Sequence, residues 1–239
     1  IKVSNLESGS ASYSSLANGI TWAADNGAQV ANLSYQAYKS STVTTAAKYM
    51  RNKGGLVVCS SGNSNIDTGY SNNASVITVG ATNSSDVRAY FSNYGDYVDV
   101  AAPGRSVLAA TNSGGYESVS GTSFSAPITA GVVGLIMSAN PNLSPDQVET
   151  ILESSADDLI AGVDWHMYYG HGRINASKAV QMALETSAAD TEAPVVSVFS
   201  PSSGSIVKGN VSVEVSASDN SSVNEVSLYA NGMLVATDT

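Results

Sequence analysis

Cysteine and histidine are scarce in this sequence, with one cysteine and two histidines in 239 residues. A single thiol excludes an internal disulfide framework and any metal site built from several cysteines. Cys59 stands in the apolar run LVVCSS without a cationic neighbour, so we expect a buried and unreactive side chain. His166 and His171 stand among aromatic residues and glycines, and we interpret both as solvated loop side chains.

Charge is also scarce, because charged residues make up only 13% of the chain, about half of the usual share of roughly 25%. The formal net charge of −10 argues against a nucleic-acid partner. A polar, acidic surface suits a secreted protein, so we expect an extracellular location. No stretch approaches 18 consecutive apolar residues, and we therefore expect neither a spanning helix nor a membrane partner.

Helical and strand-like segments alternate along residues 1–185, which predicts one domain. We expect strands at 29–33, 56–60, 76–79, 97–101 and 106–110, and helices at 13–26, 41–53, 124–139, from 145 onward and at 175–184. This alternation favours an α/β fold of three layers, a mostly parallel sheet with helices on both faces. Ligands of such sheets bind at the carboxyl ends of the strands.

One helix start and one acidic cluster can be interpreted in more detail. Ser144, Pro145 and Gln147 have the spacing of an N-cap, a first helical residue and its reciprocal capping partner. Four acidic residues follow, and we interpret them as a solvated helix face and not as a metal cluster: Glu149, Glu153, Asp157 and Asp158.

The composition changes near Thr186. Residues 186–193 are small and acidic, which predicts a linker. Residues 194–239 alternate apolar and polar side chains and contain the hairpin signal Asn231–Gly232. This pattern resembles the opening of a bacterial immunoglobulin-like module. Because such a sandwich needs about 100 residues, we expect a partial all-β appendage; a generic β extension is the alternative.

The segment Ser120–Pro127 has the features of a nucleophile held at a helix N-terminus. The run FSAPITAGVVGLIMSA, residues 124–139, is apolar or small throughout and predicts a buried helix. Ser123 then stands at its first turn, where the helix dipole and free N–H groups favour negative charge. Acyl transfer needs that environment because its transition state develops an oxyanion. The alternative is an ordinary capping serine, which is far commoner.

Together with its neighbours, this segment resembles the subtilases, the subtilisin-like serine peptidases. Residues 121–127, GTSFSAP, match the nucleophile motif of the family, and residues 56–63 resemble its strand that ends in Gly-Asn. Residues 32–35 and 8–11 resemble two of its substrate segments. Further motifs follow in the family's order at 74–80, 91–95, 98–104 and 169–175, so the likeness covers roughly residues 1–185.

The resemblance implies a serine endopeptidase that forms an acyl-enzyme on Ser123, with Asn63 in the oxyanion hole. The same resemblance implies a protein or peptide substrate and no cofactor for the chemistry. It allows structural calcium, but no acidic loop has a spacing that assigns a site. Glycine at position 62 leaves room in the specificity pocket, so we expect an apolar or aromatic residue before the cut. The residues implied to contact substrate are Gly9, Ser10, Ala11, Ser34, Tyr35, Gln36, Ser60, Ser61, Gly62 and Thr122.

Three departures from the family pattern matter. The triad aspartate and histidine should precede all of these motifs, so we expect a C-terminal part of the catalytic domain, inactive alone and dependent on the missing N-terminal segment. Gln36–Ala37 replaces a pair that is often glycine, which narrows the cleft. Phe124 replaces a residue that is often methionine, which removes an oxidisable sulfur beside the serine.

Two other functions are compatible with parts of the sequence. A catalytically inactive scaffold or binding module would explain the absent base, although the intact GTSFSAP and Asn63 argue against decay. An esterase of the α/β-hydrolase type needs Gly-x-Ser-x-Gly with the other triad members after the serine. The residues that follow Ser123 do not fit that pattern.

Overall fold

The computed structural model describes residues 2–4, 9–186, 193–219, 223 and 225–238. The chain divides into two compact units, Ile1–Ala188 and Ala189–Thr239. Most of the predicted linker, residues 187–192, lies outside the described residues, as does Ser8 of the first substrate segment. The two units are therefore described separately.

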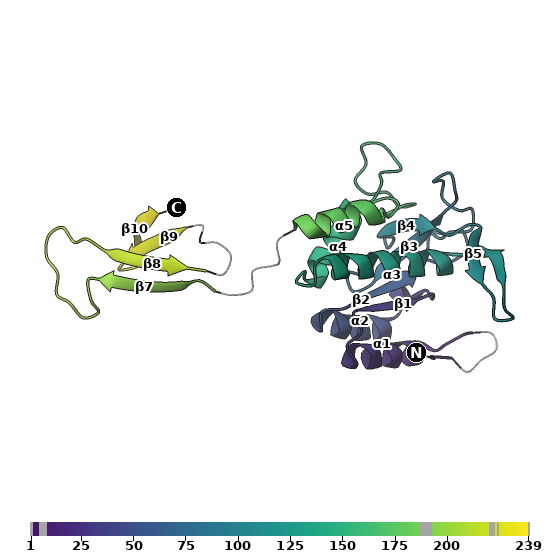
Figure 1. The fold of residues 1–239 in the computed structure, drawn as a ribbon, viewed down its shortest axis with the longest axis horizontal. Helices are drawn as coiled ribbons and strands as arrows, with labels where there is room; N and C mark the ends of the chain where they lie inside the picture. The colour runs from purple at the N-terminus through teal and green to yellow at the C-terminus, as the bar shows by residue number, and fades with distance from the viewer. Residues whose placement is uncertain (1, 5–8, 187–192, 220–222, 224, 239) are drawn as a thin grey trace. The chain divides into compact units, whose positions relative to one another are not determined.

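The first unit is built on a four-stranded parallel sheet (Figure 1). Its strands follow the chain in the order β1 (Val30–Leu33), β2 (Leu56–Ser60), β3 (Ile77–Thr82) and β4 (Val100–Pro103). Strand β2 is buried along its whole length. Continuous apolar runs of this kind are typical of parallel strands covered on both faces, and the predicted α/β fold is confirmed.

Helices cover both faces of this sheet. On one face lie α1 (Tyr13–Asp25) and α2 (Ser41–Asn52); on the other lie α3 (Thr122–Ala139), α4 (Pro145–Ser154) and α5 (Ala176–Glu185) (Figure 1). Side chains alternate across a strand. In β2, Leu56 and Val58 accordingly pack with α3, whereas Val57 and Cys59 pack with α1 and α2. The result is two cores separated by the sheet.

Local signals account for the helix starts. The Ser12 and Ser40 side chains accept hydrogen bonds from the third residue of α1 and α2, and Ser144 and Gln147 form the predicted capping box of α4. Gly27 follows α1 with a positive φ of 78°, which ends the helix where predicted.

Helix α3 is the central helix of the unit. It packs against the sheet, α4 and α5, which explains its composition of apolar and small residues. Its 18 residues have a mean hydropathy of 1.4, enough by length and composition to cross a membrane. A core helix of a globular domain passes the same test, and α3 contributes Ala126, Val133 and Ile136 to the core.

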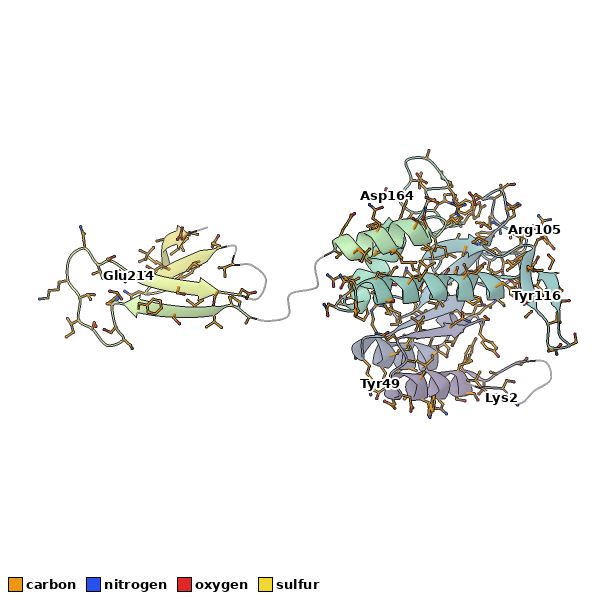
Figure 2. All side chains as sticks on the ribbon, viewed as in Figure 1. Lys2, Tyr49, Arg105, Tyr116, Asp164 and Glu214 are labelled. Carbon is orange, nitrogen blue, oxygen red and sulfur yellow. The ribbon has the colours of Figure 1, made fainter. Side chains whose placement is uncertain are left out.

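One hairpin departs from the predicted pattern. The expected strand at 106–110 is β5 (Val107–Ala110), which pairs antiparallel with the unpredicted β6 (Tyr116–Val119) and not with the main sheet. Gly114 and Gly115 adopt positive φ angles in the turn between them. Tyr116 on this hairpin is 76% exposed (Figure 2). Because β6 buries little of its surface, its sequence lacks the alternation of apolar and polar residues that would have predicted a strand.

The second unit contains two antiparallel strand pairs. β7 (Val195–Ser200) pairs with β8 (Glu214–Ser218), and β9 (Val226–Ala230) pairs with β10 (Met233–Asp238). Asn231 and Gly232, with φ of 51° and 79°, form the predicted turn between β9 and β10. Val195, Phe199 and Leu234 are more than half exposed, as expected of a partial β module.

Of the four acidic residues interpreted as a solvated face, Asp158 is exposed, but Glu149, Glu153 and Asp157 are partly buried, and the interpretation was wrong for these three. Arg51 of α2 forms ion pairs with Glu149 and with Asp146, the latter at 2.8 Å. Asp157 accepts hydrogen bonds from Lys178 Nζ at 2.6 Å and Arg173 Nη2 at 2.5 Å. Sequence spacing could not predict these contacts, because their partners come from other elements.

The Asp157 contacts predict an acid-sensitive contribution to stability. Its hydrogen bond from Lys178, followed by those from Arg173 and Asn175, lowers its pKa to about 2 from 3.8, against the effect of burial. A carboxyl with a depressed folded pKa stabilises above its unfolded pKa and loses that contribution as the pH falls from 3.8 toward 2. We expect Asp157→Asn to lower the free energy of unfolding by about 1 kcal/mol at pH 7.

Urea unfolding of both proteins between pH 7 and pH 3 measures this difference, which should shrink below pH 4. Asp164→Asn is the matched control, since Asp164 is exposed and forms no ion pair among the described residues (Figure 2). A destabilisation that persists unchanged at pH 3 would contradict the assignment to the charged pair.

Candidate functional site

The N-terminus of α3 positions Ser123 at the carboxyl end of the sheet. Gly104, directly after β4, accepts a hydrogen bond at 2.8 Å from the N–H of Gly121, which precedes the helix. Ser125 Oγ donates to the Ala102 carbonyl at 3.1 Å. A Cβ on Gly104 would lie 2.2 Å from Ser125 Oγ, so the close approach of strand and helix requires glycine there. The roles of Gly104 and Ser125 were missed by sequence reasoning, although both stand in the family motifs.

Asn63 lies directly beside the nucleophile segment. Its Oδ1 accepts hydrogen bonds from Thr122 N–H and Thr122 Oγ1, both at 2.9 Å. Thr122 Oγ1 in turn accepts from Gly62 N–H at 3.1 Å. These bonds occupy the carbonyl oxygen of the side-chain amide and leave its Nδ2 without a hydrogen-bond partner among the described residues. The predicted proximity of Asn63 to the Ser123 turn is observed.

The backbone at Ser123 has a free donor. Ser123 N–H, in the first turn of α3, forms no hydrogen bond within the described part of the chain, as is usual for a helix N-terminus. Its carbonyl accepts from Ser34 Oγ at 2.8 Å, which ties the segment after β1 to α3. Ser123 itself is only partly buried. The partly buried Ser123, its free backbone N–H and the free Nδ2 of Asn63 therefore lie together.

The two predicted substrate segments lie side by side. Tyr35 OH donates a hydrogen bond to the Gly9 carbonyl, and this bond joins the N-terminal segment to the segment after β1. Gly9 and Ser10 are exposed, and Ala11 is partly buried. The segment 9–11 is not a strand, and its Gly9 and Ser10 carbonyls accept hydrogen bonds from Tyr35 OH and Ser4 Oγ.

Ser60 and Ser61 are completely buried and do not face solvent. The Ser61 carbonyl accepts hydrogen bonds from Tyr38 OH at 3.0 Å and Asn93 Nδ2 at 3.2 Å. Asn93 Oδ1 also accepts from Ser64 N–H at 2.8 Å. Asn93 was not predicted, and together with Tyr38 it holds the backbone that carries Gly62 and Asn63.

The space beside Gly62, which was expected to admit a substrate side chain, is occupied by other side chains. A Cβ on Gly62 would lie 1.9 Å from Gln36 Nε2 and 2.5 Å from Asn93 Nδ2. The Gln36 amide therefore covers the glycine that was expected to admit a large substrate side chain.

Both histidines belong to a loop that lies near the amino end of β4. His171 N–H donates to the carbonyl of Asp99, just before β4, and His171 Nε2 lies 3.8 Å from Glu153 Oε2. His166 is paired with Gly170 in the same loop. The segment before Ser123 contacts Gly104 at the carboxyl end of β4, and neither histidine forms a hydrogen bond with Ser123 among the described residues.

Cys59 is buried as predicted. Burial is the main cause that raises its pKa to about 12, and Thr78 Oγ1 lies 3.5 Å from its Sγ. A thiol with this pKa is not a nucleophile at neutral pH. Among the described residues, no group of three His, Cys, Asp or Glu side chains is arranged to hold a metal ion.

The fold and the site define a class of protein: an α/β domain with a serine and amide donors at a helix N-terminus. The subtilase family model matches residues 1–172, and the chain belongs to that family. A bacterial Ig domain model matches residues 194–239. Both resemblances predicted from the sequence are confirmed.

The match between this chain and its named relatives covers only part of each relative. Thermitase from Thermoactinomyces vulgaris is 41% identical over 180 residues, 73% of this chain and 62% of thermitase. Subtilisin DY from Bacillus licheniformis is 39% identical over 188 residues, 76% of this chain and 67% of that protein. The chain thus spans about two thirds of the length of these two relatives.

Solved structures agree with the fold. A protease from Pseudoalteromonas arctica superposes with a TM-score of 0.64 at 33% identity, over 72% of this chain and 59% of the other. A cold-adapted subtilisin-like serine proteinase gives a TM-score of 0.59 at 34% identity, over 70% and 61% of the two chains.

Proposed function

We propose that this chain is the nucleophile-bearing part of a serine endopeptidase that hydrolyses peptide bonds of proteins. The observation that carries the proposal is the position of Asn63 beside the Ser123 turn, with Nδ2 and the Ser123 N–H both free to donate. Asn63 and Ser123, which carry these donors and the hydroxyl, are 60 positions apart in the sequence. Family membership and the relatives named above support the same activity.

The proposed reaction uses protein groups alone. Ser123 Oγ attacks the peptide carbonyl carbon while its proton passes to a histidine that this sequence does not contain. Asn63 Nδ2 and Ser123 N–H donate to the carbonyl oxygen as it becomes an oxyanion. Collapse of this intermediate expels the amine, which takes the proton, and leaves an acyl ester on Ser123. Water then hydrolyses the ester by the same steps.

The histidine and its orienting aspartate are proposed to come from a segment that precedes Ile1 in the same protein. Strand β1 lies at the edge of the sheet, and no strand pairs with its outer side among the described residues. Beside it is a groove of about 330 Å³ lined largely by apolar side chains, among them Leu16, Ile20 and Val30. An added strand would pair with β1 and cover this groove.

Hydrolysis of a protein substrate tests the peptidase proposal. The protein made from its complete coding region should degrade casein, and Ser123→Ala should abolish that activity without changing the circular dichroism spectrum. The alternative, an inactive scaffold, requires that neither protein degrades the substrate although both bind it.

We place the protein outside the cell, because its acidic, charge-poor surface and bacterial Ig domain suit that location.

We propose that residues 186–193 connect two modules, 1–185 and 194–239. Because this segment is composed of small and acidic residues, we expect limited proteolysis to cut there first. Mass spectrometry of the first two fragments locates the cut. A first cut within residues 123–139 would contradict the proposal, because α3 is in the core.

A further inference from the structure

The loop after β2, residues 61–66, carries Asn63 and is called the Asn63 loop below. The side chains of residues 63–66 are all exposed, so packing contributes little to the conformation of this part of the loop. Asn65 also adopts a left-handed φ of 55°, which is less favourable than a right-handed backbone in residues other than glycine. Apart from the contacts of Asn63 with Thr122, hydrogen bonds to the loop backbone must therefore hold Asn63 in place.

The segment of residues 91–94 runs beside the Asn63 loop and bonds to its backbone. The N–H of Asn65 donates to the Phe91 carbonyl at 2.8 Å. The N–H of Asn93 donates to the Gly62 carbonyl, also at 2.8 Å. Asn93 is only 1% exposed, and its side chain therefore lies inside the protein, against the loop.

The Asn93 carboxamide bonds to the loop on both sides of Asn63. On one side, Asn93 Nδ2 donates to the Ser61 carbonyl at 3.2 Å. On the other side, Asn93 Oδ1 accepts from the N–H groups of Ser64 at 2.8 Å and Ile66 at 3.3 Å. Reversing the amide would place a donor against two donors, so its orientation is fixed. One side chain thus holds the backbone before and after Asn63.

Loss of the Asn93 side chain would affect the two ends of the loop differently. The Ser61 carbonyl would keep a second partner, because Tyr38 OH also donates to it at 3.0 Å. The N–H groups of Ser64 and Ile66 form no other hydrogen bond within the described part of the chain. Water can take over such bonds in a surface loop. We therefore expect the fold to survive while the part of the loop after Asn63 loses its fixed geometry.

We propose that Asn93 is a positioning residue for catalysis, whose carboxamide holds the Asn63 loop so that Asn63 Nδ2 stays directed at the developing oxyanion. This inference rests on the proposed peptidase function, in which Asn63 Nδ2 and the Ser123 N–H bind that oxyanion. Oxyanion donors act because they are fixed in advance at hydrogen-bonding distance, and a displacement of about 1 Å costs about 10²-fold in rate. Asn93 forms no hydrogen bond with Ser123 among the described residues, so it acts through Asn63.

The test replaces Asn93 by alanine in the protein made from its complete coding region and follows the hydrolysis of labelled casein. We expect kcat to fall about 10- to 100-fold and KM to change little, because the oxyanion bond strengthens as the transition state forms. Titration with a fluorophosphonate counts the reactive serines, so that kcat refers to folded protein. Asn93→Ser is a second variant that leaves a smaller cavity. Its hydroxyl is too short to replace all three bonds, and kcat should fall here as well.

A double-mutant cycle distinguishes positioning from a general structural role. Once Asn63→Leu has removed the donor, Asn93→Ala should lower kcat further by less than about twofold, since the two residues act as one unit. Asn140→Ala is the matched control. Asn140 Nδ2 donates to the carbonyls of Ala183 at 3.1 Å and Thr186 at 2.8 Å, at the C-terminal end of α3. This control should lower the midpoint of urea unfolding and leave kcat unchanged.

The outcomes separate this inference from the function on which it rests. A normal kcat of Asn93→Ala, with Asn63→Leu impaired, overturns the role of Asn93 and leaves the peptidase intact. An equal loss from Asn93→Ala with and without the Asn63 side chain shows that Asn93 does not act through Asn63, and also overturns it. A normal kcat of Asn63→Leu overturns the oxyanion role of Asn63, and the role of Asn93 falls with it. Absence of Ser123-dependent hydrolysis of casein overturns the peptidase function itself.

Discussion

A fluorophosphonate probe is expected to label Ser123 very slowly in the chain of residues 1–239 and rapidly in the protein made from its complete coding region. Without a base, the hydroxyl keeps its proton and remains a weak nucleophile. Both histidines of the chain belong to the loop near the amino end of β4, and neither is hydrogen-bonded to Ser123 among the described residues. In subtilisin itself, loss of the histidine alone costs about 10⁶ in turnover, so a difference of several orders of magnitude in the labelling rate is expected.

The measurement is the rate of probe incorporation, followed by peptide mapping of the labelled residue. Ser123→Ala in the longer protein is the control for site specificity. Circular dichroism of the 1–239 chain shows whether slow labelling reflects a missing base or a missing fold. Rapid labelling of Ser123 in the 1–239 chain would contradict the assignment of the base to another segment.

Replacement of Asn63 is expected to lower turnover by about 10²–10³ in the protein made from its complete coding region, a magnitude measured for the oxyanion asparagine of subtilisin. The physical reason is the loss of the Nδ2 donor, which lies free beside Ser123 while Oδ1 is bonded to Thr122. Asn63→Leu removes the donor at similar side-chain size. We expect kcat to fall and KM to change little, because the bond strengthens as the oxyanion forms.

Asn63→Asp separates this role from a structural one. Aspartate keeps an acceptor for the Thr122 N–H and a negative charge at the start of α3, so it preserves the local structure while it removes the donor. We therefore expect Asn63→Asp to be as inactive as Asn63→Leu. Near-normal turnover of Asn63→Asp would assign Asn63 to anchoring α3. Ser64→Ala, at the exposed neighbouring position, is the control and should retain normal turnover.

Much of the fold was predictable because its signals are local. The capping box at Ser144 and Gln147 and the turn at Asn231–Gly232 each depend on residues within four positions of one another. The buried strand β2 was predicted with the same bounds, 56–60, because a short apolar run between glycines has few alternative structures. The start of β4 was predicted three residues early, since 97–99 are buried beside the strand without belonging to it.

The candidate site was predictable in its residues but not in its contacts. Motifs named Ser123 and Asn63, yet the bond that orients Asn63 comes from Thr122. The same limit explains two errors. Glycine at position 62 suggested open space, but the Gln36 amide fills it. Asp157 looked solvated in the sequence, but Arg173 and Lys178 lie against it in the fold.

The sequence by itself determined the subtilase family, the α/β class, the strand and helix that carry Asn63 and Ser123, and the β-rich C-terminal module. These follow from short motifs and from periodicity, which act over a few residues. Only the tertiary structure decided that Asn63 Nδ2 is free, that the histidine loop lies near the amino end of β4, and that the Gln36 amide fills the space over Gly62. These features depend on how segments far apart in the sequence pack around the sheet. Such long-range contacts produce no periodic pattern of residue types from which they could be predicted.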